Sequence, residues 1–185
     1  MKHILIMLGG PGAGKGTIGK MIMAQTPYHY VESGAMFRAQ GPDTEVGKII
    51  ATGNLVPDEI LFKMVESYLK TDQNMLFDGL PRTIPQAQWI VKWADKNGFG
   101  IKVVYLNAPA EILIGRMQKR ANETPVEKRR ADDLDPAIMQ NRVKTFFDKT
   151  MPLIEFFKTQ PGVEFLDIDD VPPEQQVFAD VMSKL

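Results

Sequence analysis

Short apolar runs alternate along the chain with longer amphipathic stretches. The apolar runs have the length of strands and lie at residues 2–8, 28–31, 74–78, 101–106 and 163–168. The stretches between them repeat apolar residues at the helical period, as in Ile60, Leu61, Met64 and Val65. Strands that alternate with helices predict an α/β fold, a three-layer sandwich in which helices flank a five-stranded parallel sheet.

A glycine-rich loop separates the first predicted strand from the first predicted helix. Gly9, Gly14 and Lys15 have the spacing of a phosphate-binding loop (P-loop), but the hydroxyl comes one residue late, at Thr17. Glycines let backbone N–H groups close around an anion, and the helix N-terminus adds further donors. Lys15 would place a charge beside a phosphate, and Thr17 a hydroxyl in a Mg²⁺ shell. A dinucleotide-binding loop is disfavoured, because it has no use for Lys15.

Other polar residues lie where predicted strands end, which is where parallel α/β folds bind ligands. Ser33-Gly34 and Asp78-Gly79 both lie at such ends. An aspartate beside the P-loop strand would help to hold Mg²⁺ through water, and the alternative interpretation of Asp78 is a turn or capping residue.

Arginine side chains supply the other candidate phosphate ligands, because a guanidinium grips phosphate oxygens and stays charged. The candidates are Arg38, Arg82, Arg120 and Arg130, of which Arg82 directly follows a strand-end turn. The chain has no cysteine and only two histidines. Cations with a few carboxylates favour phosphoryl transfer over general base catalysis.

Bulk composition narrows the class of protein. A chain of 185 residues suits one domain, and a formal net charge of −1 gives no support to binding nucleic acid or a membrane surface. No apolar run is long enough to span a bilayer, and residues 1–3 lead directly into a strand, so we expect no signal peptide. The lack of cysteine fits a reducing compartment. We therefore expect a cytoplasmic monomer.

Four motifs have counterparts in one family. Residues 9–17 (GGPGAGKGT), 53–58 (GNLVPD), 78–83 (DGLPRT) and 130–133 (RADD) resemble, in the same order, the phosphate loop, two further signatures and the lid of adenylate kinases, within the wider nucleoside monophosphate kinases. The family's phosphate loop has the same late threonine. The resemblance covers essentially the whole chain. It implies a P-loop kinase that transfers the γ-phosphoryl of Mg·ATP to AMP, giving two ADP.

The resemblance implies roles residue by residue. ATP would be held by Gly12, Ala13, Gly14, Lys15, Gly16, Thr17, Arg116, Arg120 and the backbone near Val171. AMP would be held by Ser33, Gly34, Arg38, Asn54, Leu55, Val56, Gly79, Arg82, Gln86, Arg130 and Arg142. Lys15, Arg82, Arg120, Arg130 and Arg142 would act in the transfer itself. Mg²⁺ would be held by Thr17 and, through water, by Asp78.

The resemblance also divides the chain. It implies one kinase domain over residues 1–185, with a trimmed AMP-binding insertion at about 33–56 and a short lid at about 121–133 that has no room for structural zinc. Glu32 and Ala35 replace the family's usual serine and aspartate, and Arg142 comes one residue late, after Asn141. Without ligand, the cations Arg116, Arg120 and Arg130 are expected to repel one another and keep the lid open.

Two alternatives to an AMP kinase stay open. One is a UMP or CMP kinase on the same fold, against which Gln86 argues, since a side-chain amide pairs with the adenine edge; the alternative for Gln86 is a helix-surface residue. The other is an ATP-binding module that has lost catalysis, which the trimmed insertion and the shifted Arg142 suggest.

Overall fold

The five predicted strands form one parallel sheet in the computed structural model, which describes residues 2–185 apart from the side chains of residues 128 and 131. The strand order is β2-β3-β1-β4-β5. The strands are β1 (His3–Gly9), β2 (His29–Glu32), β3 (Met75–Asp78), β4 (Gly100–Asn107) and β5 (Val163–Asp169). The predicted fold class is confirmed, and the strand bounds differ from the apolar runs by at most one residue at either end.

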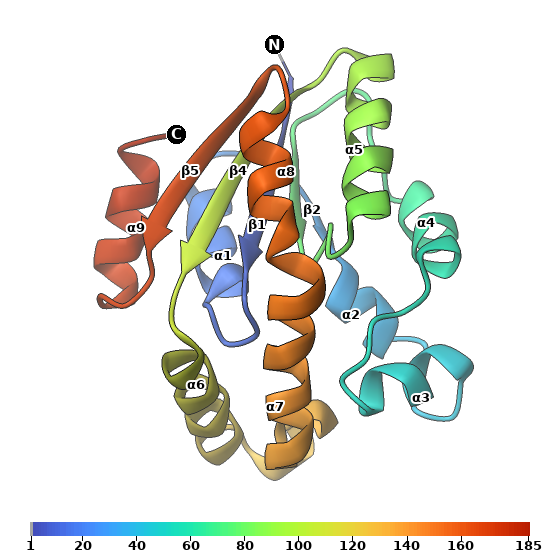
Figure 1. Ribbon diagram of the computed structural model, residues 1–185, viewed down its shortest axis with the longest axis vertical. Coiled ribbons are helices and arrows are strands. Elements are labelled where there is room, and N and C mark those ends of the chain that lie inside the picture. The colour runs from blue at the N-terminus through green and yellow to red at the C-terminus, as the bar shows by residue number, and fades with distance from the viewer. Residues whose placement is uncertain (1) are drawn as a thin grey trace.

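Both faces of the sheet are covered by helices, because successive strand residues point to opposite faces. Ile4, Ile6 and Leu8 of β1 join the core formed with α4 (Asp58–Glu66), α5 (Ile84–Asn97) and α8 (Pro152–Thr159). Leu5 and Met7 join the opposite core, formed with α1 (Lys15–Gln25), α6 (Ala110–Glu123) and α9 (Glu174–Met182). The structure is therefore the predicted three-layer sandwich (Figure 1).

The remaining helices lie beyond the carboxyl ends of the strands, toward which the arrowheads point in Figure 1. They are α2 (Ser33–Arg38), α3 (Glu45–Ala51) and α7 (Pro136–Thr145). Short helical turns at Val126–Lys128 and Ala131–Asp133 precede α7. The segments that the resemblance assigns to AMP and to the lid thus border the same end of the sheet.

α7 continues into α8 through a single π-helical turn at Phe146–Thr150, in which the Met151 N–H donates to the Phe146 carbonyl at 2.9 Å. The periodic pattern of this stretch predicts that both Phe146 and Phe147 point inward. Phe147 is instead 39% exposed and Phe146 is buried. Adjacent helical residues point in different directions, and in this turn Phe146 takes the direction that faces the core.

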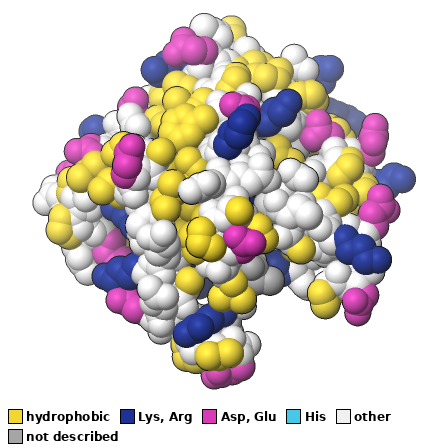
Figure 2. All heavy atoms as spheres, turned by 60° about the horizontal axis from the view of Figure 1, so that its bottom comes forward, with side chains coloured by type: hydrophobic (Ala, Val, Ile, Leu, Met, Phe, Trp, Pro, Cys, Tyr) yellow, Lys and Arg dark blue, Asp and Glu magenta, His cyan; other side chains and the backbone are white. Residues whose placement is uncertain are grey.

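No helix among residues 2–185 is long and apolar enough to cross a membrane. On the face shown in Figure 2, Lys and Arg side chains are interspersed with Asp and Glu side chains rather than gathered in one area. This mixture agrees with the nearly balanced total of 22 basic and 23 acidic residues.

Candidate functional site

A cleft of about 500 Å³ opens at the carboxyl ends of the strands and contains most of the predicted site residues. Those that line it are Gly12, Ala13, Gly14, Lys15, Gly16, Thr17, Gly34, Arg38, Asn54, Leu55, Asp78, Gly79, Arg82, Arg120, Arg130 and Arg142. Residues that we did not predict also line it, among them Glu32, Asp132 and Thr150. The structure thus brings residues from widely separated segments to one site.

The P-loop joins β1 to α1 in a conformation that requires glycine. Gly12 has φ +88°, and a Cβ there would lie 2.5 Å from the Leu113 carbonyl oxygen of α6. Gly14, the N-cap of α1, has φ +67° and no side chain that could cap the helix. The N–H groups of the first helical turn are therefore available to an anion, which the positive end of the helix dipole also favours.

Lys15 lies across the P-loop. Its ammonium donates to the carbonyl oxygens of Gly9 at 2.9 Å and Gly10 at 2.8 Å. Burial lowers the pKa of Lys15 to about 8, while the charge of Asp78 opposes that shift. A bound phosphate would supply the opposite charge that the ammonium lacks here and raise its pKa again.

Asp78 ends β3 beside the P-loop, and only 7% of it is exposed. Its Oδ2 accepts a hydrogen bond from the Tyr30 hydroxyl at 2.8 Å. Burial, together with the charge of Asp78, raises the pKa of Tyr30 well above its ordinary value, so the hydroxyl stays a donor. With the Thr17 hydroxyl in the same cleft, the donor set consists of oxygen atoms, which suits Mg²⁺.

Arg82 is fixed at the turn after β3. Its Nε donates to the Gly79 carbonyl at 2.8 Å, and its own carbonyl accepts from the Thr150 hydroxyl at 3.0 Å. Burial lowers the pKa of Arg82, and the charges of Arg142 and Arg38 lower it further. These three guanidinium groups therefore act on one region of the cleft.

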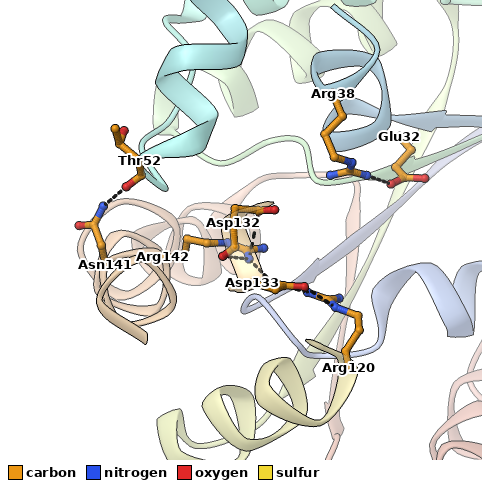
Figure 3. A network of polar contacts seen from close by, with 8 residues as sticks. All are labelled: Glu32, Arg38, Thr52, Arg120, Asp132, Asp133, Asn141 and Arg142. Carbon is orange, nitrogen blue, oxygen red and sulfur yellow. Dashed lines mark hydrogen bonds and ion pairs between the residues drawn. The ribbon is translucent and has the colours of Figure 1, made fainter. Parts of the chain in front are cut away.

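Aspartates hold the arginines of the predicted lid region, as Figure 3 shows. Asp133 is 1% exposed; its Oδ2 accepts from Arg120 Nε at 2.7 Å and its Oδ1 from Arg142 Nη1 at 2.5 Å. Asp132 Oδ2 lies 3.0 Å from Arg142 Nη1. Asp133 thus bridges Arg120, one of the cations expected to repel its neighbours, to Arg142, while burial and then the charge of Arg130 lower the pKa of Arg120.

The shifted arginine lies in the cleft. Arg142 reaches Asp132 and Asp133, whereas Asn141, in the place expected for the arginine, turns outward from the cleft lining. The Asn141 amide donates to the Thr52 carbonyl at 2.9 Å, beyond the end of α3 (Figure 3). The one-residue displacement along the chain thus leaves a guanidinium at the site.

Two residues that we predicted to bind AMP form hydrogen bonds with other groups of the protein. Ser33 is buried and donates to the Gly79 carbonyl at 2.7 Å. Gln86 is 1% exposed; its amide donates to Asp58 Oδ1 and accepts from the Arg82 N–H, each at 2.6 Å. The role of Gln86 at the adenine edge stays a prediction, since it requires the amide to exchange these partners.

The other predicted residues outside the cleft lie at its two sides. Val56 is buried and lines a smaller cavity of about 430 Å³, shared with Asn54 and Leu55. Arg116 Nη1 is 2.6 Å from Asp170 Oδ2, and burial raises the pKa of Asp170 to about 6 although Arg116 opposes the shift. Val171 is 52% exposed.

The sequence predicted the arginines of the site but not the carboxylates that pair with them. Glu32, Asp133 and Asp170 each hold an arginine that we predicted. Asp133 lies within the matched motif at 130–133, but nothing in the motif says which arginine it contacts. Tyr30, which holds Asp78, lies one strand away and has no local signal.

Comparisons with known proteins agree with the geometry. The family model for adenylate kinase matches residues 7–161. An adenylate kinase of Lachnospira eligens is 32% identical over 98% of this chain and 99% of its own length. The adenylate kinase of Phocaeicola vulgatus is 31% identical over 97% and 96%, and that of Maricaulis maris 34% identical over 88% and 89%. The chain belongs to the adenylate kinase family.

Proposed function

We propose that the protein transfers the γ-phosphoryl group of Mg·ATP to AMP, giving two molecules of ADP. The observation that carries this proposal is the gathering of a P-loop lysine and several arginines around one cleft, namely Lys15, Arg38, Arg82, Arg120, Arg130 and Arg142. Two nucleotides that meet at their phosphates bring a large negative charge, and such a set of cations helps to balance it. Membership of the adenylate kinase family supports the same reaction.

The site can work by positioning and by charge. The P-loop N–H groups and Lys15 hold the ATP phosphates, while Arg38 and Arg82 hold the acceptor phosphate. Arg120, Arg130 and Arg142 neutralise the charge that develops on the transferred group. Phosphoryl transfer requires little covalent help from the protein, so preorganised donors of this kind supply most of the rate enhancement.

We assign the binding of the two nucleotides to opposite sides of the cleft. Residues 33–56, with α2 and α3, act as the acceptor-binding insertion of the single kinase domain, and residues 121–133 act as its lid. Closure of these segments would exclude water and protect the phosphoryl group from hydrolysis. The protein acts as a cytoplasmic monomer, and the mixed charge of the face in Figure 2 supports a role without nucleic acid or membranes.

Magnesium enters with ATP. The Thr17 hydroxyl and, through water, the Asp78 carboxylate would hold it, and the ion would neutralise phosphate charge. Most of its ligands would be phosphate and water oxygens, as Mg²⁺ prefers.

A comparison of acceptors tests the function. ADP formation from Mg·ATP is measured at steady state with AMP, UMP, CMP or GMP, and we expect the highest kcat/KM with AMP. A preference for UMP or CMP would replace the adenylate kinase assignment with the pyrimidine kinase alternative. No ADP above background with any acceptor would leave the ATP-binding module as the better account.

The Tyr30→Phe variant is expected to need more Mg²⁺. Loss of the hydrogen bond from Tyr30 to Asp78 removes about 1 kcal/mol of positioning, so the Mg²⁺ concentration for half-maximal rate should rise about fivefold. The rate at saturating Mg²⁺ should change less. Tyr28→Phe is the matched control, since its hydroxyl contacts His3 outside the cleft lining. An unchanged Mg²⁺ midpoint in Tyr30→Phe would contradict the role of Asp78.

A further inference from the structure

An internal ion pair involves one of the two arginines that we assign to the acceptor phosphate, Arg38 and Arg82. Arg38 Nη2 donates to Glu32 Oε1 at 2.9 Å, and both side chains line the cleft (Figure 3). The side chains are 34% and 27% exposed, so the pair is partly shielded from solvent. The other acceptor arginine, Arg82, is held by a carbonyl oxygen and keeps its charge for a ligand.

The Glu32 carboxylate has no structural task in the helix that it precedes. Glu32 is the N-cap residue of α2, yet its side chain forms no capping hydrogen bond. Its carboxylate instead accepts a hydrogen bond from Arg38, on the last turn of the same helix. In the sheet, Glu32 pairs in register with Asp78, so a second carboxylate lies at the strand ends beside the first.

We propose that Glu32 sets the affinity of the acceptor site by competing with the acceptor phosphate for Arg38. This inference rests on the proposed function, which makes Arg38 a phosphate ligand. A carboxylate tethered beside Arg38 has a high effective concentration. Bare anions such as inorganic phosphate, which gain nothing from a base pocket, then occupy the site poorly. A nucleoside monophosphate displaces Glu32 because its base and sugar add contacts of their own.

The competition has a definite sign. When the acceptor phosphate takes Arg38, the ion pair between Arg38 and Glu32 must break, and the attraction that is lost counts against phosphate binding. Neutralising Glu32 should therefore tighten acceptor binding. Glu32→Gln is the informative change, because the amide oxygen can still accept from Arg38 and keep its orientation.

Calorimetric titration without ATP measures the effect directly. We expect Glu32→Gln to bind AMP up to about fivefold more tightly than the unchanged protein, which corresponds to about 1 kcal/mol, the upper end for a partly exposed ion pair. Inorganic phosphate, titrated alone or as a competitor of AMP, should gain by a similar factor. Glu45→Gln makes the same charge change on α3 outside the cleft lining, and its affinities should be unchanged.

A double-mutant cycle with Arg38→Ala assigns the effect to the pair. In the Arg38→Ala background, Glu32→Gln should change AMP affinity by less than about twofold, because the contested cation is gone. Equal tightening in both backgrounds, or weaker AMP binding by Glu32→Gln, would overturn the proposal. The phosphate titration does not depend on catalysis, so a protein that makes no ADP from AMP would defeat the proposed function and still leave this inference tested.

Discussion

Lys15→Ala is expected to lower kcat about 100- to 1,000-fold, the loss of about 2.7–4 kcal/mol seen when one preorganised charge donor is removed from a transition state. The ammonium matters most as charge shifts during transfer, so nucleotide binding should weaken less than kcat falls. Its present contacts to the Gly9 and Gly10 carbonyls hold it at the phosphate position.

Two measurements separate these effects. Steady-state kinetics with saturating Mg·ATP gives kcat, and calorimetric titration gives the ATP affinity of the same variant. Lys92→Ala, which removes an exposed lysine from α5, is the control and should behave as the unchanged protein. A near-normal kcat for Lys15→Ala would remove Lys15 from the mechanism.

Asp133→Ala is expected to destabilise the fold by about 3 kcal/mol. The change leaves the guanidinium groups of Arg120 and Arg142 beside each other without their shared carboxylate, and breaking one partner of a buried pair costs about 3–5 kcal/mol. We take the lower end because Arg120 is 34% exposed and water screens its charge. The free energy of unfolding is measured by urea denaturation.

The matched control removes an exposed carboxylate from a surface pair. Asp148 pairs with Lys144, four residues earlier and one helical turn away. The Asp148 side chain is 49% exposed and the Lys144 side chain 73%. Asp148→Ala should therefore change the free energy of unfolding by about 0.5 kcal/mol or less. Equal losses in the two variants would mean that the Asp133 bridge contributes no more than a surface pair.

The fold was predictable because its strands and its P-loop each have a signal in the local sequence. Apolar runs of strand length mark the sheet. The P-loop glycines mark positions at which the backbone adopts a positive φ, a conformation that other residues rarely adopt. Because parallel α/β folds bind ligands at the carboxyl ends of their strands, the sequence also predicted that Asp78 and the P-loop lie at the same site. Phe147 shows the limit of the pattern: a run of apolar residues names the buried stretch but not which neighbour faces in.

Most of the polar contacts were not predictable, because they join segments that only the tertiary structure brings together. Arg120 and Asp133 are 13 residues apart, and Gln86 and Asp58 are 28 apart on different helices. A sequence shows how many cationic residues lie near a motif, but not which carboxylate side chains pair with them in the folded protein. Repulsion among the lid cations was the expectation from that count, which could not show that Asp170 pairs with Arg116 or that Asp133 pairs with Arg120.

The carboxylates in and around the cleft also bear on how the protein responds to ionic strength. Unpaired cations would rely on dissolved anions to stay close, and their spacing would change with added salt. Here Asp133 supplies that counter-charge from a side chain that is 2% exposed, at contact distances far shorter than the screening length of about 8 Å in physiological salt. The spacing of Arg120 and Arg142 should therefore change little with added salt.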